Sequence, residues 1–283
     1  MKRILVPTDF SDTALKAVIY AAELAMKSGG TVTLLHIIPP DENKVWRPHV
    51  MEDEYEATVI RELQSKLNTI WINLMHEYPD LTVITDLKQG VISSAIAAYA
   101  AEQHMDLVVM GTTGANGIKE IFMGSVTAGL IGKLNVPLLA VPVSFEMKEP
   151  QRILLAVNQF DVKINVIDPV ISVANYFNSQ VHVAVFVDTD EARPEDFIIN
   201  GRQLESFVNQ LRKEYSSINF VSRQLDGHEF EQTMEQYFTE QDINLVAMIP
   251  QQKKLLERIT GKSATKKMAF HSTFPLLVLS CKY

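Results

Sequence analysis

One order of apolar strands and amphipathic helices runs through the chain twice, and this repeat limits the fold more than any other feature. The segment QRILLAVNQ matches KRILVPTDF at an offset of 149 residues, and FPLLVLS matches VPLLAVP at an offset of 138 without a gap. Unrelated domains would not keep one register over such stretches. We therefore predict a tandem duplication with domains at 1–147 and 150–283, each of ordinary domain size.

Within each copy, short apolar runs alternate with segments of helical periodicity. In the first copy the expected strands are KRILVP, TVTLLHII, LTVITDL, DLVVM and VPLLAVPV, and the expected helices cover residues 11–30, 54–75, 91–104 and 126–133. Regular alternation of this kind predicts an α/β fold, in which a five-stranded parallel sheet in each domain carries helices on both faces.

Composition excludes several classes of function. The formal net charge of −8 argues against a role in binding nucleic-acid backbones, and no apolar run reaches the ~18–20 residues of a membrane span. The amino terminus meets Pro7 and Asp9 too early for a signal peptide, so we expect a cytoplasmic protein without membrane or nucleic-acid partners. A single cysteine, Cys281, rules out an intramolecular disulfide, and the seven scattered histidines lack metal-ligand spacing.

A glycine-rich stretch, GTTGANGIKEIFMGSV, follows the fourth expected strand. Ligands of doubly wound sheets bind beyond the carboxyl ends of the strands, and glycine lets backbone N–H groups approach an anion closely. Gly124 and Ser125 also precede a predicted helix, whose amino end favours anions. The stretch therefore predicts a phosphate site. It does not match the dinucleotide pattern, and a P-loop at Gly261-Lys262-Ser263 fails because Leu256 replaces the required glycine.

The spacing Gly111-x2-Gly114-x9-Gly124-Ser125, combined with ILVPTDFSD and LLHII, resembles the universal stress protein family. The resemblance covers both copies in architecture, but its motifs lie in the first copy only. It implies two Rossmann-like domains of the adenine nucleotide alpha hydrolase-like type. It also implies an ATP site, with ADP or AMP as alternatives and Mg²⁺ arriving with the phosphates.

Carried over residue by residue, the resemblance gives each expected contact a role. Asp9 would contact the adenine beside Pro7 and Thr8, and Ile37 would pack on the face of the base. The remaining contacts, expected at the ribose and phosphates or beside them, are Met110, Gly111, Gly114, Gly124, Ser125 and Val126. Two other interpretations stay open: Asp9 as a cap of the first helix, and His36 as a core histidine that binds no ligand.

The second copy lacks these features. Gly111 is matched by Ile249, Gly124 by Lys262 and Asp9 by Asn158. Gln252 replaces Gly114, Ala156 replaces Pro7, and Phe186 replaces Ile37. We expect no comparable ATP site there, and we expect this domain to act as an intramolecular pseudo-dimer partner. Its FPLLVLSCKY would cover the apolar edge strand VPLLAVPV, with a homodimer also possible.

The sequence thus predicts an adenine-nucleotide-binding stress-response or regulatory protein. No acid–base pair stands out near the glycine stretch, so binding is favoured over chemistry. A slow ATP-hydrolysing enzyme on the same fold remains one alternative. A scaffold without nucleotide, in which the glycines serve only as turn residues, is the other.

Overall fold

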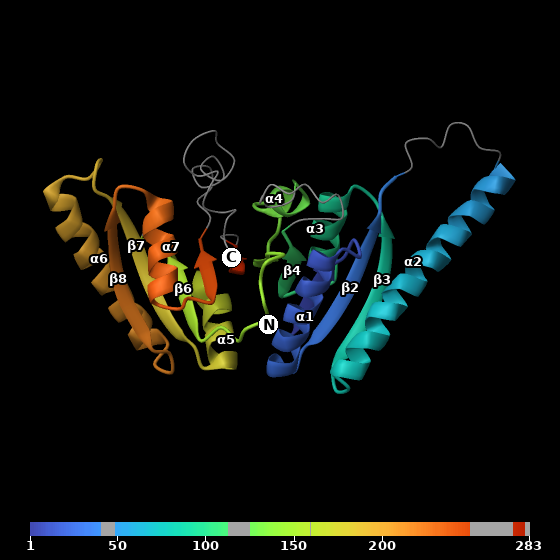
Figure 1. Cartoon of the computed structure of the whole chain (residues 1–283), viewed down its shortest axis with the longest axis horizontal. Coiled ribbons are helices and arrows are strands. Elements are labelled where there is room, and N and C mark those ends of the chain that lie inside the picture. Colours follow the sequence, from blue (N-terminus) through green and yellow to red (C-terminus); the bar gives the residue numbers. More distant parts are fainter. Residues whose placement is uncertain (41–48, 113–124, 159, 250–273, 281–283) are drawn as a thin grey trace.

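The chain forms one ten-stranded sheet in the order β3-β2-β1-β4-β5-β10-β9-β6-β7-β8 (Figure 1). This computed structural model describes residues 1–40, 49–112, 125–158, 160–249 and 274–280. The strands of the N-terminal half are β1 Arg3–Pro7, β2 Thr31–Ile38, β3 Thr82–Gln89, β4 Leu107–Gly111 and β5 Leu138–Val141. Those of the C-terminal half are β6 Arg152–Ala156, β7 Gln180–Asp188, β8 Phe220–Gly227, β9 Leu245–Met248 and β10 Leu276–Val278.

Pairing is parallel within each half, and the two halves repeat one strand order, 3-2-1-4-5 and 8-7-6-9-10. The expected α/β class with a five-stranded parallel sheet in each half is therefore confirmed. The halves meet at β5 and β10, which are antiparallel with Leu277 opposite Leu139. Both strands are fully buried at this junction.

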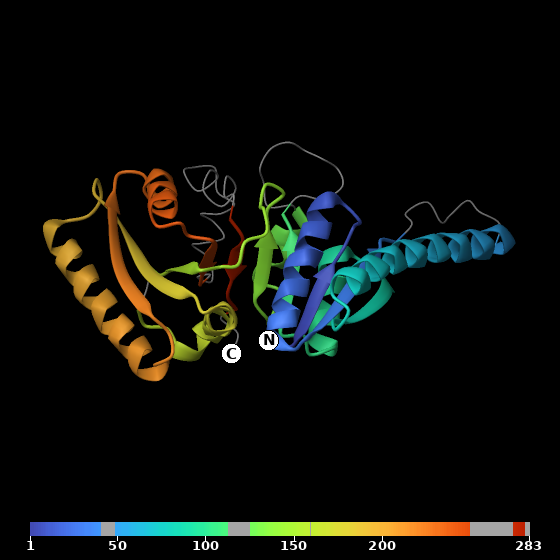
Figure 2. The same cartoon turned by 60° about the horizontal axis from the view of Figure 1, so that its bottom comes forward.

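Helices cover both faces of the sheet. The N-terminal half contributes α1 Asp12–Ser28, α2 His49–Glu77, α3 Ile92–Glu102 and α4 Ser125–Leu130. The C-terminal half contributes α5 Asp168–Phe177, preceded by a 3₁₀ turn at Ile164–Ile167, then α6 Pro194–Glu214 and α7 Phe230–Glu240. The helices α1, α2, α5 and α6 pack on one face, while α3, α4 and α7 pack on the other. The long α2 continues well past the sheet (Figures 1 and 2).

The first helix begins and ends where its sequence predicts. The Ser11 hydroxyl accepts a hydrogen bond from the Ala14 N–H at 3.2 Å, and Gly29 closes the helix with φ 62°, a conformation that glycine adopts without steric cost. Because Ser11 is the N-cap, the interpretation of Asp9 as the helix cap is wrong.

Contacts of α1 and of the amino terminus join the two halves across the junction. The Lys27 ammonium lies 2.7 Å from the Glu149 carboxylate and 5.6 Å from the centre of the Phe177 ring on α5. The amino-terminal ammonium donates to the Tyr176 hydroxyl at 3.1 Å. Buried side chains from both halves form continuous clusters on each face of the sheet.

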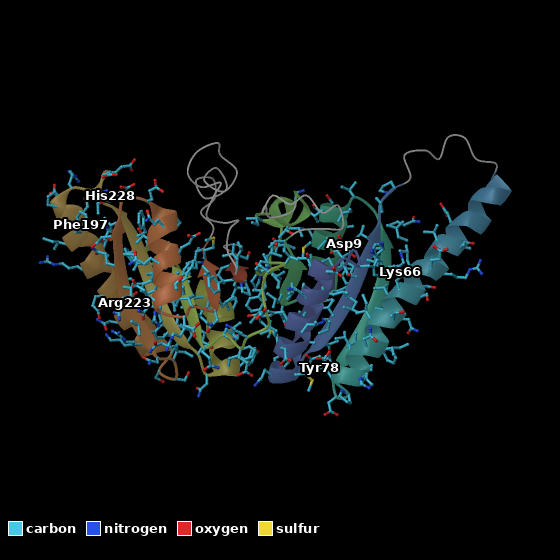
Figure 3. The ribbon with its side chains drawn as sticks, in the orientation of Figure 1. Asp9, Lys66, Tyr78, Phe197, Arg223 and His228 are labelled. Carbon is cyan, nitrogen blue, oxygen red and sulfur yellow. The ribbon has the colours of Figure 1, made fainter. Side chains whose placement is uncertain are left out.

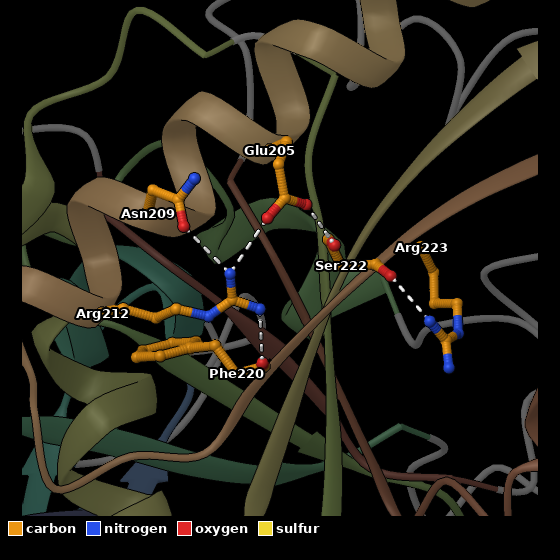
Figure 4. Close-up of polar contacts among 6 residues, drawn as sticks. All are labelled: Glu205, Asn209, Arg212, Phe220, Ser222 and Arg223. Carbon is orange, nitrogen blue, oxygen red and sulfur yellow. Dashed lines mark hydrogen bonds and ion pairs between the residues drawn. The ribbon is translucent and has the colours of Figure 1, made fainter.

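At the far end of the C-terminal half, polar contacts attach α6 to the edge strand β8 (Figure 4). The Arg212 guanidinium donates to the Glu205 carboxylate, the Asn209 amide oxygen and the Phe220 carbonyl, each at 3.0 Å. Glu205 in turn accepts from the Ser222 hydroxyl at 2.7 Å. The hydrogen bond from Ser222, followed by the one from Arg212, lowers the pKa of the Glu205 carboxyl.

Candidate functional site

The candidate site lies between β1 and β4, where the strand order of the N-terminal half reverses. Among the described residues, these strands pair only at Ile4–Leu107 and Leu5–Val108, although β1 continues to Pro7 and β4 to Gly111. Past the paired positions each strand pairs, among the described residues, only with its other neighbouring strand. The Thr8 N–H bonds to the Leu35 carbonyl on β2, and the Thr112 N–H bonds to the Val141 carbonyl at the end of β5. The hydrogen-bonded pairing of β1 with β4 thus ends before the carboxyl ends of the strands, where ligands of doubly wound sheets bind, and these unpaired strand ends are called the opening below.

The turn after β1 presents Asp9 at this opening. Asp9 is exposed, and one of its carboxylate oxygens accepts hydrogen bonds from the Ser11 N–H at 3.0 Å and the Ser11 hydroxyl at 2.5 Å. Thr8 is buried, and its hydroxyl accepts from the Phe10 N–H at 3.1 Å. Figure 3 shows Asp9 at the carboxyl ends of the N-terminal strands, with Lys66 of α2 toward the same end. The carboxylate is therefore held in a defined orientation at an accessible position.

Two apolar residues of the predicted set share one face of the sheet beside the opening. Ile37 is 6% exposed and Met110 is 7% exposed, and both belong to the cluster that packs with α3 and α4. They lie at the carboxyl ends of β2 and β4. Branched and flexible apolar side chains at this position can cover the face of a flat ring.

Gly111 is confined by α1. A Cβ atom built at this position would lie 2.6 Å from the Thr13 methyl carbon and 2.8 Å from the Thr13 backbone carbon and oxygen. The Gly111 carbonyl accepts from the Thr127 hydroxyl at 3.2 Å, which ties β4 to α4. The first requirement for glycine here is the close approach of α1 to β4, a reason that differs from the predicted approach of a phosphate.

The phosphate end of the predicted set falls partly outside the described residues. Gly114 and Gly124 lie in 113–124, so the structure says nothing of them. Ser125 begins α4 as its first residue, and Val126 is partly buried against the α3–α4 cluster. Of the ten predicted contacts, the structure brings Pro7, Thr8 and Asp9 together with Met110 and Gly111 around the opening, and Ile37 lies one strand away.

Sequence reasoning did not assign roles to several residues that shape this site. Phe10 has a left-handed backbone with φ 66°, and its ring lies 4.6 Å from the His36 ring. His36 Nδ1 lies 2.7 Å from the Thr8 carbonyl oxygen, so His36 has a hydrogen-bond partner, as the core-histidine interpretation requires. The contact between Thr127 and Gly111 has no signature in the sequence, because it joins a helix to a strand.

A groove of about 370 Å³ occurs elsewhere, between α2 and β3. Its lining residues are Ile38, Ile60, Gln64, Leu67 and 85–89. None of these belongs to the predicted site. Within the described ranges, no three metal-ligating side chains are grouped closely enough to hold an ion, and no described helix is both long and apolar enough to cross a membrane.

Comparison with known proteins agrees with this architecture. Universal stress protein MJ0577 of Methanocaldococcus jannaschii is 29% identical over 154 residues, which cover 50% of this chain and 94% of that protein. The crystal structure of a universal stress protein from Archaeoglobus fulgidus superimposes with a TM-score of 0.66, covering 98% of this chain and 96% of that one at 17% identity. Another universal stress protein, 23% identical with a TM-score of 0.34 over 50% of this chain and 96% of that one, was solved in complex with cAMP.

The profile of the universal stress protein family matches residues 1–142, just over half of the chain. The chain therefore belongs to the universal stress protein family.

Proposed function

We propose that this protein binds an adenine nucleotide, with ATP as the expected ligand, in the N-terminal half only. The observation that carries the proposal is the opening between β1 and β4, which has an oriented carboxylate on one side and a glycine on the other. A crevice at the reversal of strand order is the usual ligand position in such sheets.

The chemistry of each described residue suits this ligand. The Asp9 carboxylate can accept a hydrogen bond from the amino group of an adenine, and the buried Ile37 and Met110 offer an apolar surface for the ring. The glycine motif continues from Gly111 toward Ser125, where family resemblance assigns the ribose and phosphates. Phosphate oxygens would bring Mg²⁺ with them, since this cation prefers oxygen ligands.

In the C-terminal half the corresponding strand ends are paired. Strands β6 and β9 stay paired over four positions, from Ile153–Leu245 to Ala156–Met248, the last residue of each strand. At the place of Ile37 stands Phe186, and its ring meets the Phe230 ring of α7 at 5.0 Å, edge to face. We propose that this half, residues 150–283, serves as the pairing partner of a nucleotide-binding domain at residues 1–147, through the antiparallel β5–β10 contact.

The test measures the amount and the location of bound nucleotide. Mass spectrometry of nucleotide released from the purified protein, followed by titration with ATP and Mg²⁺, should give one adenine nucleotide per chain. Asp9→Ala and Gly114→Val should each abolish or strongly weaken binding, whereas Asn158→Ala in the C-terminal half should leave the stoichiometry at one.

Two nucleotides per chain would contradict the assignment to one half, and no binding at all would contradict the proposed function. The same samples, incubated with ATP and Mg²⁺, show whether ATP is turned over. Steady turnover would point to the hydrolase alternative instead.

A further inference from the structure

We propose that His36 is a positioning residue that sets the preference of the site for adenine over guanine, an inference that rests on the proposed function. His36 lies on β2 immediately before Ile37, and successive strand residues face opposite sides of the sheet. Ile37 packs with α3 and α4, whereas the His36 ring contacts Phe10, which packs with the α1–α2 cluster. His36 therefore acts from behind the proposed site, through another residue.

The link is the carbonyl group of Thr8. His36 Nδ1 lies 2.7 Å from this oxygen, and a carbonyl can only accept, so Nδ1 carries the proton and donates. On its other side, the Thr8 N–H bonds to the Leu35 carbonyl at 2.9 Å, and its hydroxyl accepts from Phe10. Thr8 is only 6% exposed. Its peptide groups are thus fixed on both sides directly before Asp9.

Phe10 completes the support. Its φ of 66° is an uncommon backbone conformation for a bulky side chain and persists only where surrounding contacts hold it. Those contacts are the His36 ring, with its centre 4.6 Å away at an interplanar angle of 32°, and the Lys66 ammonium, 5.5 Å from the centre of the Phe10 ring. Asp9 lies between Thr8 and Phe10, so its carboxylate takes its direction from two residues that His36 contacts.

The C-terminal half shows that the fold itself does not require the contacts of His36. In the C-terminal half Val157 takes the place of Thr8, and its N–H still bonds to the Ala184 carbonyl at 2.8 Å, as Thr8 does to Leu35. Val185 takes the place of His36, and Asn158 that of Asp9. The strand pairing is therefore made without the histidine, the hydroxyl or the carboxylate. All three occur together only in the half proposed to bind nucleotide.

An oriented carboxylate distinguishes the two purines. The 6-amino group of adenine donates a hydrogen bond, whereas the 6-oxo group of guanine is an acceptor that a carboxylate repels. The donors of guanine are N1–H and the 2-amino group, which a carboxylate fixed opposite position 6 does not face. Discrimination of this kind depends on a fixed position of the acceptor, because a mobile carboxylate can shift to accept from the N1–H and 2-amino groups of guanine. Release of the Thr8 carbonyl should therefore reduce the preference for adenine more than it reduces binding of the phosphates.

The experiment compares dissociation constants of the full chain for ATP and GTP, with Mg²⁺, in two variants matched at one position. His36→Phe keeps a ring against Phe10 but removes the donor. His36→Asn places an amide N–H where Nδ1 was and removes the ring. We expect His36→Phe to lower the ATP-to-GTP affinity ratio about tenfold, chiefly by weakening ATP, and His36→Asn to keep the ratio within about threefold of the wild type.

Each outcome decides between positioning and mere structural support. Equal weakening of ATP and GTP by His36→Phe, or an unchanged ratio, overturns the inference while the proposed function stands. A wild type that binds neither nucleotide overturns both. Should His36→Phe not fold, the ATP-to-GTP affinity ratio is measured in His36→Leu, which also lacks the donor, and an unchanged ratio there also contradicts the inference.

Discussion

At the amino ends of their first strands, the two halves of the sheet are held by equivalent contacts. The Asp106 carboxylate accepts from the N–H groups of Lys2 and Arg3 at 2.6 and 3.0 Å. The Asn244 amide oxygen accepts from the corresponding groups of Gln151 and Arg152 at 3.1 and 3.3 Å. An acid and its amide serve equally here, since each needs only one accepting oxygen.

At the carboxyl ends the halves differ. The first and fourth strands are paired at two positions in the N-terminal half, β1 with β4, and at four in the C-terminal half, β6 with β9. The approach of the first helix differs as well. Only four residues separate the end of β1 from the start of α1 at Asp12, whereas α5 begins only at Asp168 after an intervening 3₁₀ turn. The early start of α1 brings Thr13 against Gly111, while the equivalent Ile249 carries a full buried side chain.

The end of the sheet that aligns the strands and the end that is available to a ligand can therefore change separately. Duplicated contacts persist where they align strands. Contacts that shape the proposed site are replaced by ordinary apolar packing, as at Phe186 and Phe230. Four predictions test this difference between the halves, beginning with the largest expected effect.

Gly111→Ala should destabilise the N-terminal half by about 3 kcal/mol, because its Cβ would meet the Thr13 backbone, which cannot move without shifting α1. Urea unfolding followed by tryptophan fluorescence reports on this half, since Trp46 and Trp71 both lie in it. The matched control is Gly201→Ala on α6, whose Cβ approaches nothing closer than the end of the flexible Gln224 side chain at 3.2 Å. It should stabilise its helix by about 0.5–1 kcal/mol. A Gly111→Ala variant as stable as the wild type would contradict the explanation that glycine is required here by the close packing of α1.

The C-terminal half should lose stability in acid through His182, which stands where the first half has Thr33. His182 is buried, and its ring nitrogens bond to the Tyr237 hydroxyl at 2.6 Å and the Gln180 side-chain oxygen at 2.8 Å. Burial first, then the charges of Arg223 and Arg152, lowers the pKa of His182 to about 4. Between about pH 6.5 and pH 4 the unfolded chain therefore binds the proton first, and stability should fall by about 2 kcal/mol.

The measurement is the free energy of unfolding of wild type and His182→Gln across this pH range. Glutamine keeps donor and acceptor groups but does not titrate, so the variant should lose less stability than the wild type as the pH falls. Parallel pH profiles would show that His182 is not the source of the effect.

Much of this fold was predictable from the sequence, because each segment has the apolar pattern of either a strand or a helix and not a mixture of the two. The strand TVTLLHII is apolar apart from its first residues and His36, and the ends of α1 are fixed by Ser11 and Gly29. For the site, the sequence names candidate residues but not the contacts that hold them in place. The spacing of glycines does not show that Gly111 is confined by Thr13, since that contact joins a strand to a helix.

The support behind Asp9 was equally hidden from the sequence. The left-handed conformation of Phe10 has no residue signature, because glycine or asparagine would be expected there. The His36–Thr8 hydrogen bond joins residues 28 positions apart, and only the register of β1 on β2 brings them together. The early end of the β1–β4 pairing likewise has no signal in either strand's own sequence.

Thr8→Val places in the N-terminal half the residue that the C-terminal half has at this position. It should lower the free energy of unfolding by about 1 kcal/mol, because the Phe10 N–H loses its hydroxyl acceptor while the side-chain volume stays similar. Thr8→Ser keeps the hydroxyl and should bind nucleotide as the wild type does. Val157→Thr, the reverse exchange in the second half, should create no nucleotide binding. Titration with ATP measures the affinity of all three variants, and thermal unfolding measures their stability. A Thr8→Val variant with the ATP affinity of the wild type would show that the Thr8 hydroxyl plays no part in nucleotide binding.

The smallest effect is expected in the network that attaches α6 to β8. Arg212 and Glu205 are 41% and 51% exposed, so water and salt screen their attraction, and a double-mutant cycle of Arg212→Gln with Glu205→Gln should give a coupling of about 0.5 kcal/mol. The lowered pKa of Glu205 means that this contribution is lost as the pH falls through the folded pKa, below the ordinary carboxyl range. The coupling should also shrink in 0.5 M salt. A salt-independent coupling several times larger would show that the edge of the second half depends on this network, and that packing alone does not hold it.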